Sequence, residues 1–124
     1  MKVLIIQQNS RKNGVISSLF AENGEVIHKR SLKDAMDTFV DNFCNNKPFD
    51  LVVSDSHTAV KRLRRVEKKL TTDPIKYSKM MVLGPGNNYK RVLDAFEGGA
   101  NTYLEYPHTP SEFIQGLNDI NLSV

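Results

Sequence analysis

Short apolar runs alternate with longer amphipathic stretches along the whole chain. The runs at residues 3–6, 51–53 and 80–83 are three or four residues long, contain β-branched side chains and give way to polar residues or glycine, as strands of a buried sheet do. Between them, apolar residues recur every three or four positions, which is the spacing of an amphipathic helix. The predicted strands lie at residues 3–6, 25–29, 51–53, 80–83 and 101–104.

Capping residues indicate where the helices begin. Ser31 followed by Asp34, and Thr109 followed by Glu112, have the spacing of capping boxes. Ser10 is a suitable cap for the helix after the first run. The apolar residues that define the five helices are Val15, Ile16, Leu19 and Phe20; Met36, Phe39, Val40 and Phe43; Ala59, Leu63, Val66 and Leu70; Val92, Leu93 and Phe96; and, all facing inward, Phe113, Ile114, Leu117 and Ile120.

Strict alternation of strands and helices predicts an α/β fold. Such an order is typical of a parallel sheet with helices on both faces and right-handed crossovers. We therefore expect one doubly wound, flavodoxin-like domain over residues 1–124, a (βα)5 unit with strand order 2-1-3-4-5. A chain of 124 residues is large enough for one core and too small for two.

Composition and charge limit the partners and the cellular compartment that we expect for this chain. A formal net charge of +3, from 17 basic and 14 acidic residues, does not by itself indicate nucleic-acid binding. The single cysteine, Cys44, cannot form an internal disulfide, which favours a reducing compartment. Because no apolar run approaches the roughly 18 residues of a membrane span, we expect a soluble, cytoplasmic protein with no membrane partner.

Basic residues are concentrated in the third predicted helix. Such a cluster usually forms a solvated face. No aromatic residues are interleaved for base stacking, so a surface for an acidic partner protein is the stronger functional interpretation. The residues are Lys61, Arg62, Arg64, Arg65, Lys68 and Lys69.

Polar residues after the strands form a candidate site. In an open parallel sheet, ligands gather at the carboxyl ends of the strands. Asp55 follows the third strand, Gln7 and Gln8 follow the first, Gly84 follows the fourth and Tyr106 follows the fifth. We expect these residues to lie near one another.

Two stretches resemble the receiver domains of two-component response regulators. They are D-L-V-V-S-D at residues 50–55 and G-G-A-N-T-Y-L-E-Y-P-H-T-P-S-E-F at residues 98–113. The resemblance covers nearly the whole chain and implies that Asp55 stands at the phosphoacceptor position of a phosphorelay. It also implies that Tyr103 stands at the position of the switch aromatic.

The positions that support phosphotransfer in that family are substituted here. Gln7 and Gln8 replace the acid pair that holds Mg²⁺, Gly84 replaces the hydroxyl residue, and Tyr106 replaces the lysine. Amide oxygens bring no negative charge, so we expect Mg²⁺ binding to be weak or absent. We expect no other metal site and no cofactor. These losses around Asp55 favour a degenerate, or pseudo-receiver, domain that is not an enzyme and signals through protein–protein contacts.

The resemblance also nominates a surface for those contacts. In receiver domains, the fourth helix, fifth strand and fifth helix commonly mediate dimerisation and partner binding. Here that face would hold Tyr89, Arg91, Tyr103, Glu105 and Tyr106.

Two other functions are compatible with the sequence. Asp55 could serve as a working phosphoacceptor for a histidine kinase, with help from Asp50 or His57. The simpler interpretation of Asp55 is a carboxylate bonded to nearby backbone N–H groups. Alternatively, residues 9–14 would be the phosphate loop of a flavodoxin-like flavin- or nucleotide-binding enzyme.

The extent of the whole protein stays open. The 124 residues fit both a complete protein and the amino-terminal domain of a longer regulator. We expect nucleic-acid binding only if an output domain lies outside this chain.

Overall fold

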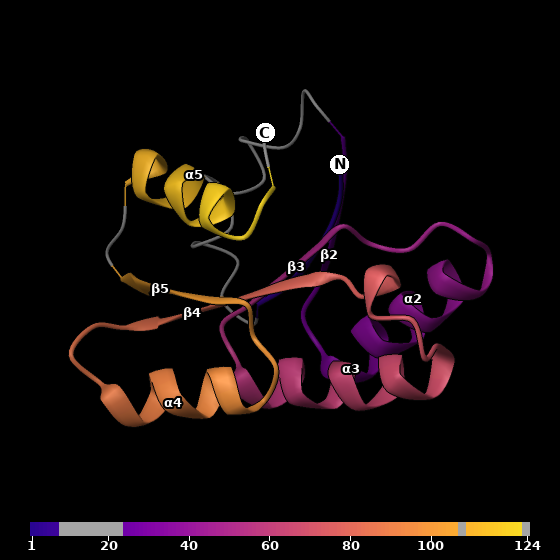
Figure 1. Cartoon of the computed structure of the whole chain (residues 1–124), viewed down its shortest axis with the longest axis horizontal. Helices are drawn as coiled ribbons and strands as arrows, with labels where there is room; N and C mark the ends of the chain where they lie inside the picture. Colours follow the sequence, from indigo (N-terminus) through magenta and orange to yellow (C-terminus); the bar gives the residue numbers. More distant parts are fainter. Residues whose placement is uncertain (8–23, 107–108, 123–124) are drawn as a thin grey trace.

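The computed structural model describes residues 1–7, 24–106 and 109–122, with only the backbone described at Tyr106. The helix expected after Ser10 and the loop at residues 9–14 lie outside the described residues. The described elements, labelled as in Figure 1, are β1 (Lys2–Ile6), β2 (Glu25–Lys29), α2 (Leu32–Cys44), β3 (Leu51–Ser54), α3 (His57–Leu70), a 3₁₀ turn (Pro74–Lys76), β4 (Lys79–Pro85), α4 (Tyr89–Glu97), β5 (Thr102–Tyr106) and α5 (Pro110–Asp119).

The five strands form one parallel sheet, in the order β2-β1-β3-β4-β5. This confirms the predicted fold class and strand order. Ile6 pairs with Ser54, and Ser54 pairs with Val82, so β1, β3 and β4 end at the same edge. The register thereby places Gln7, Asp55 and Gly84 at the carboxyl edge of the sheet.

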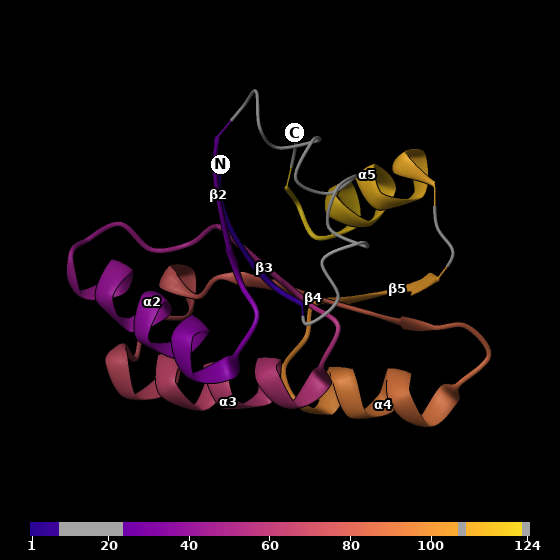
Figure 2. The same ribbon diagram turned by 180° about the vertical axis from the view of Figure 1, so that it is seen from behind.

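Helices lie on both faces of the sheet. α2, α3 and α4 lie side by side on one face, and α5 lies on the other (Figures 1 and 2). Successive strand residues point to opposite faces and therefore enter two separate core clusters. Leu4, Val52, Met80 and Val82 pack with Phe39, Leu63 and Ala95. Val3, Ile5, Leu51, Val53, Met81 and Leu83 pack with Phe113 and Leu117.

The caps predicted at Ser31 and Thr109 are present, and Ser10 lies outside the described residues. Ser31 Oγ accepts a hydrogen bond from Asp34 N at 3.1 Å, and Thr109 Oγ1 accepts one from Glu112 N at 3.2 Å. Asn88 caps α4, with its Oδ1 accepting from Arg91 N at 3.2 Å. These bonds satisfy N–H groups that a helix leaves without internal partners.

Two helices differ from their predicted apolar faces. The prediction that Ile114 faces inward is wrong, because α5 packs through Phe113 and Leu117 and leaves Ile114 36% exposed. In α4, the small Ala95 is the buried residue, whereas Leu93 is 60% exposed and Phe96 is 46% exposed. Apolar spacing identified both helices correctly. In α5 it also identified the buried side, through Phe113, Leu117 and Ile120, whereas in α4 it did not.

Arg64 also departs from the expected solvated face. Its guanidinium donates to the carbonyl oxygens of Gly99 at 2.8 Å and Ser78 at 2.7 Å, and to Asn101 Oδ1 at 2.7 Å. It also pairs with the fully buried Glu67 at 2.6 Å, and Glu67 Oε2 accepts from Ser78 N at 2.8 Å. The Arg64–Glu67 network therefore ties α3 to the segments that enter β4 and β5.

No helix in the described part of the chain is long and apolar enough to cross a bilayer.

Candidate functional site

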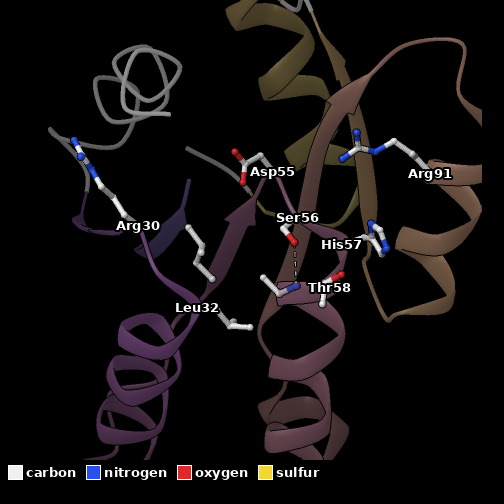
Figure 3. A pocket seen from close by; sticks show the side chains of 9 residues that line it. Arg30, Leu32, Asp55, Ser56, His57, Thr58 and Arg91 are labelled. Carbon is white, nitrogen blue, oxygen red and sulfur yellow. Dashed lines mark hydrogen bonds between the residues drawn. The ribbon is translucent and has the colours of Figure 1, made fainter. Parts of the chain in front are cut away.

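A cavity of about 340 Å³ opens at the carboxyl edge of the sheet, beside Asp55 (Figure 3). Its walls come from β1, the turn between β2 and α2, the end of β3, the first turn of α3, and α4. The residues that line it are Ile6, Arg30, Leu32, Asp55, Ser56, His57, Thr58, Ala59 and Arg91.

Local hydrogen bonds hold Asp55 at the carboxyl edge of the sheet. Asp55 N donates to Ile6 O at 3.4 Å, which continues the pairing of β1 with β3. Ser54 Oγ accepts from Ser56 N at 3.0 Å, and Ser56 Oγ accepts from Ala59 N at 3.4 Å as the cap of α3. The chain thus turns from strand to helix directly after Asp55.

Among the residues that the structure describes, the Asp55 carboxylate accepts no hydrogen bond within 3.5 Å and makes no ion pair within 4.0 Å. Within that part of the chain, the bonds expected from backbone N–H groups are not formed. The cavity instead brings two arginines to its rim, Arg30 and Arg91. In Figure 3 the Arg91 side chain reaches toward the side of the cavity where Asp55 lies, while Arg30 extends away from it.

The sequence reasoning missed Arg30. It follows β2 directly, so the rule that parallel strands end at one edge of the sheet could have identified it. His57 lies in the cavity wall as expected from its nearness to Asp55. Asp50 does not, because it precedes β3 at the opposite edge, where its Oδ2 accepts from Lys2 N at 2.7 Å. The suggested help of Asp50 at Asp55 is therefore wrong.

Gln7 lies beside this site and is 1% exposed. Its N donates to Lys29 O at 3.2 Å, and its carbonyl oxygen lies 3.2 Å from His28 Nε2. Gln8 lies outside the described residues. Within the described ranges, no group of three or more His, Cys, Asp or Glu side chains could hold a metal ion.

Tyr103 occupies the space next to Gly84. A Cβ atom built on Gly84 would stand 2.1 Å from the Tyr103 hydroxyl oxygen and 2.9 Å from its Cζ. The hydroxyl donates to Pro85 O at 3.0 Å. Burial raises the pKa of the Tyr103 hydroxyl; the nearby Arg91 lowers it, and Glu105 raises it. The tyrosine at the switch-aromatic position therefore packs where a side chain at position 84 would otherwise lie.

The residues nominated as an interaction face are in different environments. Tyr89 is 84% exposed and Glu105 is exposed, whereas Arg91 is half-buried at the cavity and Tyr103 is half-buried against Gly84. The Tyr106 side chain lies outside what the structure describes. Leu93 and Phe96, which sequence reasoning did not assign to this face, follow Tyr89 on α4 at i+4 and i+7 and are also exposed.

Comparisons with known proteins identify the fold. No family model matches the chain, and the search of curated proteins found no match. Among solved structures, the chemotaxis response regulator CheY4 of Vibrio cholerae is 18% identical, with 96% of this chain and 97% of that chain covered and a TM-score of 0.73. A response regulator receiver domain protein of Clostridium thermocellum is 22% identical, with 97% and 94% covered and a TM-score of 0.73.

FixJ-N is 14% identical, with 99% of this chain and 96% of that chain covered and a TM-score of 0.72. These likenesses extend over nearly the full length of each chain, at low sequence identity. The chain therefore has the CheY-like receiver fold.

Proposed function

We propose that this chain is a degenerate receiver domain, which signals through protein contacts and not through Mg²⁺-dependent phosphorylation of Asp55. The observation that carries the proposal is the packing of Tyr103 against Gly84. In receiver domains a hydroxyl after the fourth strand moves toward the phosphoryl group, and the aromatic of the fifth strand follows it inward. Here position 84 has no side chain, and Tyr103 already fills that space and is bonded to Pro85 O.

In this arrangement the Tyr103 side chain has one preferred position, against Gly84. Movement of Tyr103 away from Gly84 would break the hydrogen bond to Pro85 and expose a ring that is half-buried. No hydroxyl at position 84 is available to couple that movement to events at Asp55. The α4–β5 surface would therefore keep one conformation regardless of phosphorylation.

The donor atoms around Asp55 also fit Mg²⁺ poorly. Magnesium is held in proteins mainly by carboxylates, phosphates and water. Asp55 is the one carboxylate among the described residues of the cavity wall, Gln7 stands at an acid position, and two arginines line the rim. The positive charge of those arginines further disfavours a divalent cation.

The surface of α4 supplies a basis for protein contacts. Tyr89, Leu93 and Phe96 form an exposed apolar stripe along its solvent side. Contiguous exposed apolar side chains of this kind are typical of interaction sites. Together with Glu105 on β5 they form the surface through which we propose that a protein partner or a second copy binds.

A phosphorylation experiment tests the proposal. Wild type and Asp55→Asn are treated with beryllofluoride, or with a small phosphodonor, at increasing Mg²⁺, and adducts are measured by mass spectrometry. We expect neither protein to gain an adduct. An adduct on the wild type alone, with saturable Mg²⁺ binding, would show that Asp55 is a working phosphoacceptor.

The working phosphoacceptor is the second candidate function. One observation that favours it is that no described residue forms a hydrogen bond or ion pair with the Asp55 carboxylate. The other is Arg91 in the cavity wall, whose guanidinium could bind phosphoryl oxygens. The same experiment distinguishes the two functions. The flavin alternative depends on residues 9–14, which are not described, and absorbance of the purified protein near the flavin bands tests it directly.

A further inference from the structure

The solvent face of α3 carries only positive charge. At about 100° per residue, its five exposed basic residues fall within an arc of about 120° of the helix surface. Glu67 is the only acidic residue of α3, and it is fully buried against Arg64. No carboxylate of this helix therefore screens the exposed residues Lys61, Arg62, Arg65, Lys68 and Lys69.

The neighbouring helix α2 carries a matching acidic stripe. Asp34, Asp37 and Asp41 are exposed and fall within an arc of about 60°. They lie opposite Ala35 and Phe39, which are buried against the sheet. The solvent side of α2 is thus mainly acidic, with Lys33 as its one exposed cation.

The two stripes share one spacing and one direction. Asp34, Asp37 and Asp41 follow the pattern i, i+3, i+7, and so do Arg62, Arg65 and Lys69. Both helices follow parallel strands, and they lie side by side on the same face of the sheet (Figures 1 and 2). Each stripe extends over about 10 Å at 1.5 Å per residue.

These charges have no ion-pair partners within the described part of the chain. The ion pairs within 4.0 Å there are Lys2–Glu25 and Arg64–Glu67, and neither involves an exposed residue of the two stripes. The stripes are therefore available to another molecule.

We propose that a second copy of this chain docks on the α2–α3 surface, about a two-fold axis that runs between the two helices and along them. Such an axis sets α2 of one copy against α3 of the other in the same direction, and the contact repeats by symmetry. It sets the three acidic residues against three basic residues of identical spacing, twice per dimer. The facing pairs are Asp34 with Arg62, Asp37 with Arg65, and Asp41 with Lys69. In each pair the basic residue lies three residues further along its helix, because both helices begin three residues after strand ends that pair with Ile6. That offset is about 4.5 Å, which the long side chains of Arg and Lys can span.

The acidic stripe is the reason to favour a second copy over a nucleic acid. A polyanion bound along α3 would place phosphates beside α2, because packed helices lie only about 8–10 Å apart. That distance is within the Debye length of about 10 Å at 0.1 M salt, so the three carboxylates would repel the phosphates. A second copy meets both stripes with opposite charge.

The interface depends on different helices from the α4 stripe of the proposed function, so either can fail alone. Exposed ion pairs are individually weak and are screened by salt. We therefore expect a weak dimer that dissociates at high salt, whereas contacts through the apolar α4 stripe would persist. Sedimentation equilibrium of the full chain at about 0.05 M and about 1 M salt should show the dissociation constant rising at least about tenfold.

Charge-reversal variants give the sharper test. Asp37→Arg and Arg65→Asp should each abolish the salt-sensitive dimer, because each places like charges opposite one another twice. An equimolar mixture should restore it, because the arginine introduced in one variant then meets the aspartate introduced in the other, while the unchanged pair also remains. Restoration also shows that both variants are folded. Lys76→Asp, at an exposed lysine of the 3₁₀ turn, is the control and should leave the dimer intact.

Three outcomes would overturn the proposal. The first is a wild type that stays monomeric at low salt, and the second is a mixture of variants that fails to restore the dimer. The third is binding of a short DNA duplex that Arg65→Asp abolishes and Asp37→Arg strengthens, without self-association of the wild type. That third result would assign α3 to polyanion binding.

Discussion

Charged side chains at the two edges of the sheet differ in their hydrogen bonding. At the amino edge, Arg64 and Glu67 are bonded to each other and to the segments that enter β4 and β5. At the carboxyl edge, the Asp55 carboxylate has no such bond within the described chain and faces a cavity. A buried polar group without partners is costly, so the first arrangement is what a stable fold requires. The Asp55 carboxylate is only partly buried at the cavity, so it stays without such partners at little cost.

The largest expected effect is at the amino edge. Glu67→Ala should reduce the free energy of unfolding by about 3 kcal/mol or more, because it leaves the Arg64 guanidinium and the Ser78 N–H without their buried partner. Urea unfolding measures this. The adjacent exposed Lys68→Ala is the control, with an expected change below about 0.5 kcal/mol. A loss below about 1 kcal/mol for Glu67→Ala would contradict the role assigned to this network.

The next effect is steric and lies at the carboxyl edge. Gly84→Thr places a Cβ 2.1 Å from the Tyr103 hydroxyl and should cost about 1–3 kcal/mol as the ring is displaced. A double-mutant cycle with Tyr103→Ala should show that most of this cost disappears when the ring is absent. Gly116→Ala is the matched control, since its Cβ would meet only Met81 Cε at 3.4 Å. Additive losses in the cycle would mean that Tyr103 does not fill the space beside Gly84.

A smaller effect depends on pH. Burial raises the pKa of Tyr103, so the folded state favours the neutral hydroxyl more than the unfolded state does. The resulting stability is fully present below the unfolded value of about 10 and is lost as pH rises through the folded value. Between about pH 9 and 11, wild type should lose more stability than Tyr103→Phe, in urea unfolding at each pH. Parallel losses in the two proteins would contradict a half-buried hydroxyl that is bonded to Pro85 O.

The contrast between the edges also explains which features the sequence could predict. Strand order and the positions of Gln7, Asp55 and Gly84 follow from alternation and from parallel topology, and these expectations agree with the structure. The inward turn of Arg64 could not be read from a basic run, because it depends on a buried acid and on two segments distant in sequence. The packing of Tyr103 could not be predicted from the sequence either, because a glycine at position 84 does not indicate which side chain fills the space beside it.

The smallest expected effect is at Asp55 itself. Asp55→Asn should change the free energy of unfolding by less than about 0.5 kcal/mol, because the carboxylate has no hydrogen bond to lose among the described residues and only the partly solvated arginines of the cavity to attract it. Asp50→Asn is the comparison, because it replaces the charged acceptor of the 2.7 Å bond from Lys2 N with a neutral amide oxygen, and the weaker bond should cost about 0.5–1.5 kcal/mol. Urea unfolding of both variants ranks the two acids that flank β3. If Asp55→Asn proved the more damaging, the carboxylate would be part of the scaffold, and the contrast between a bonded amino edge and an open carboxyl edge would fail at its central residue.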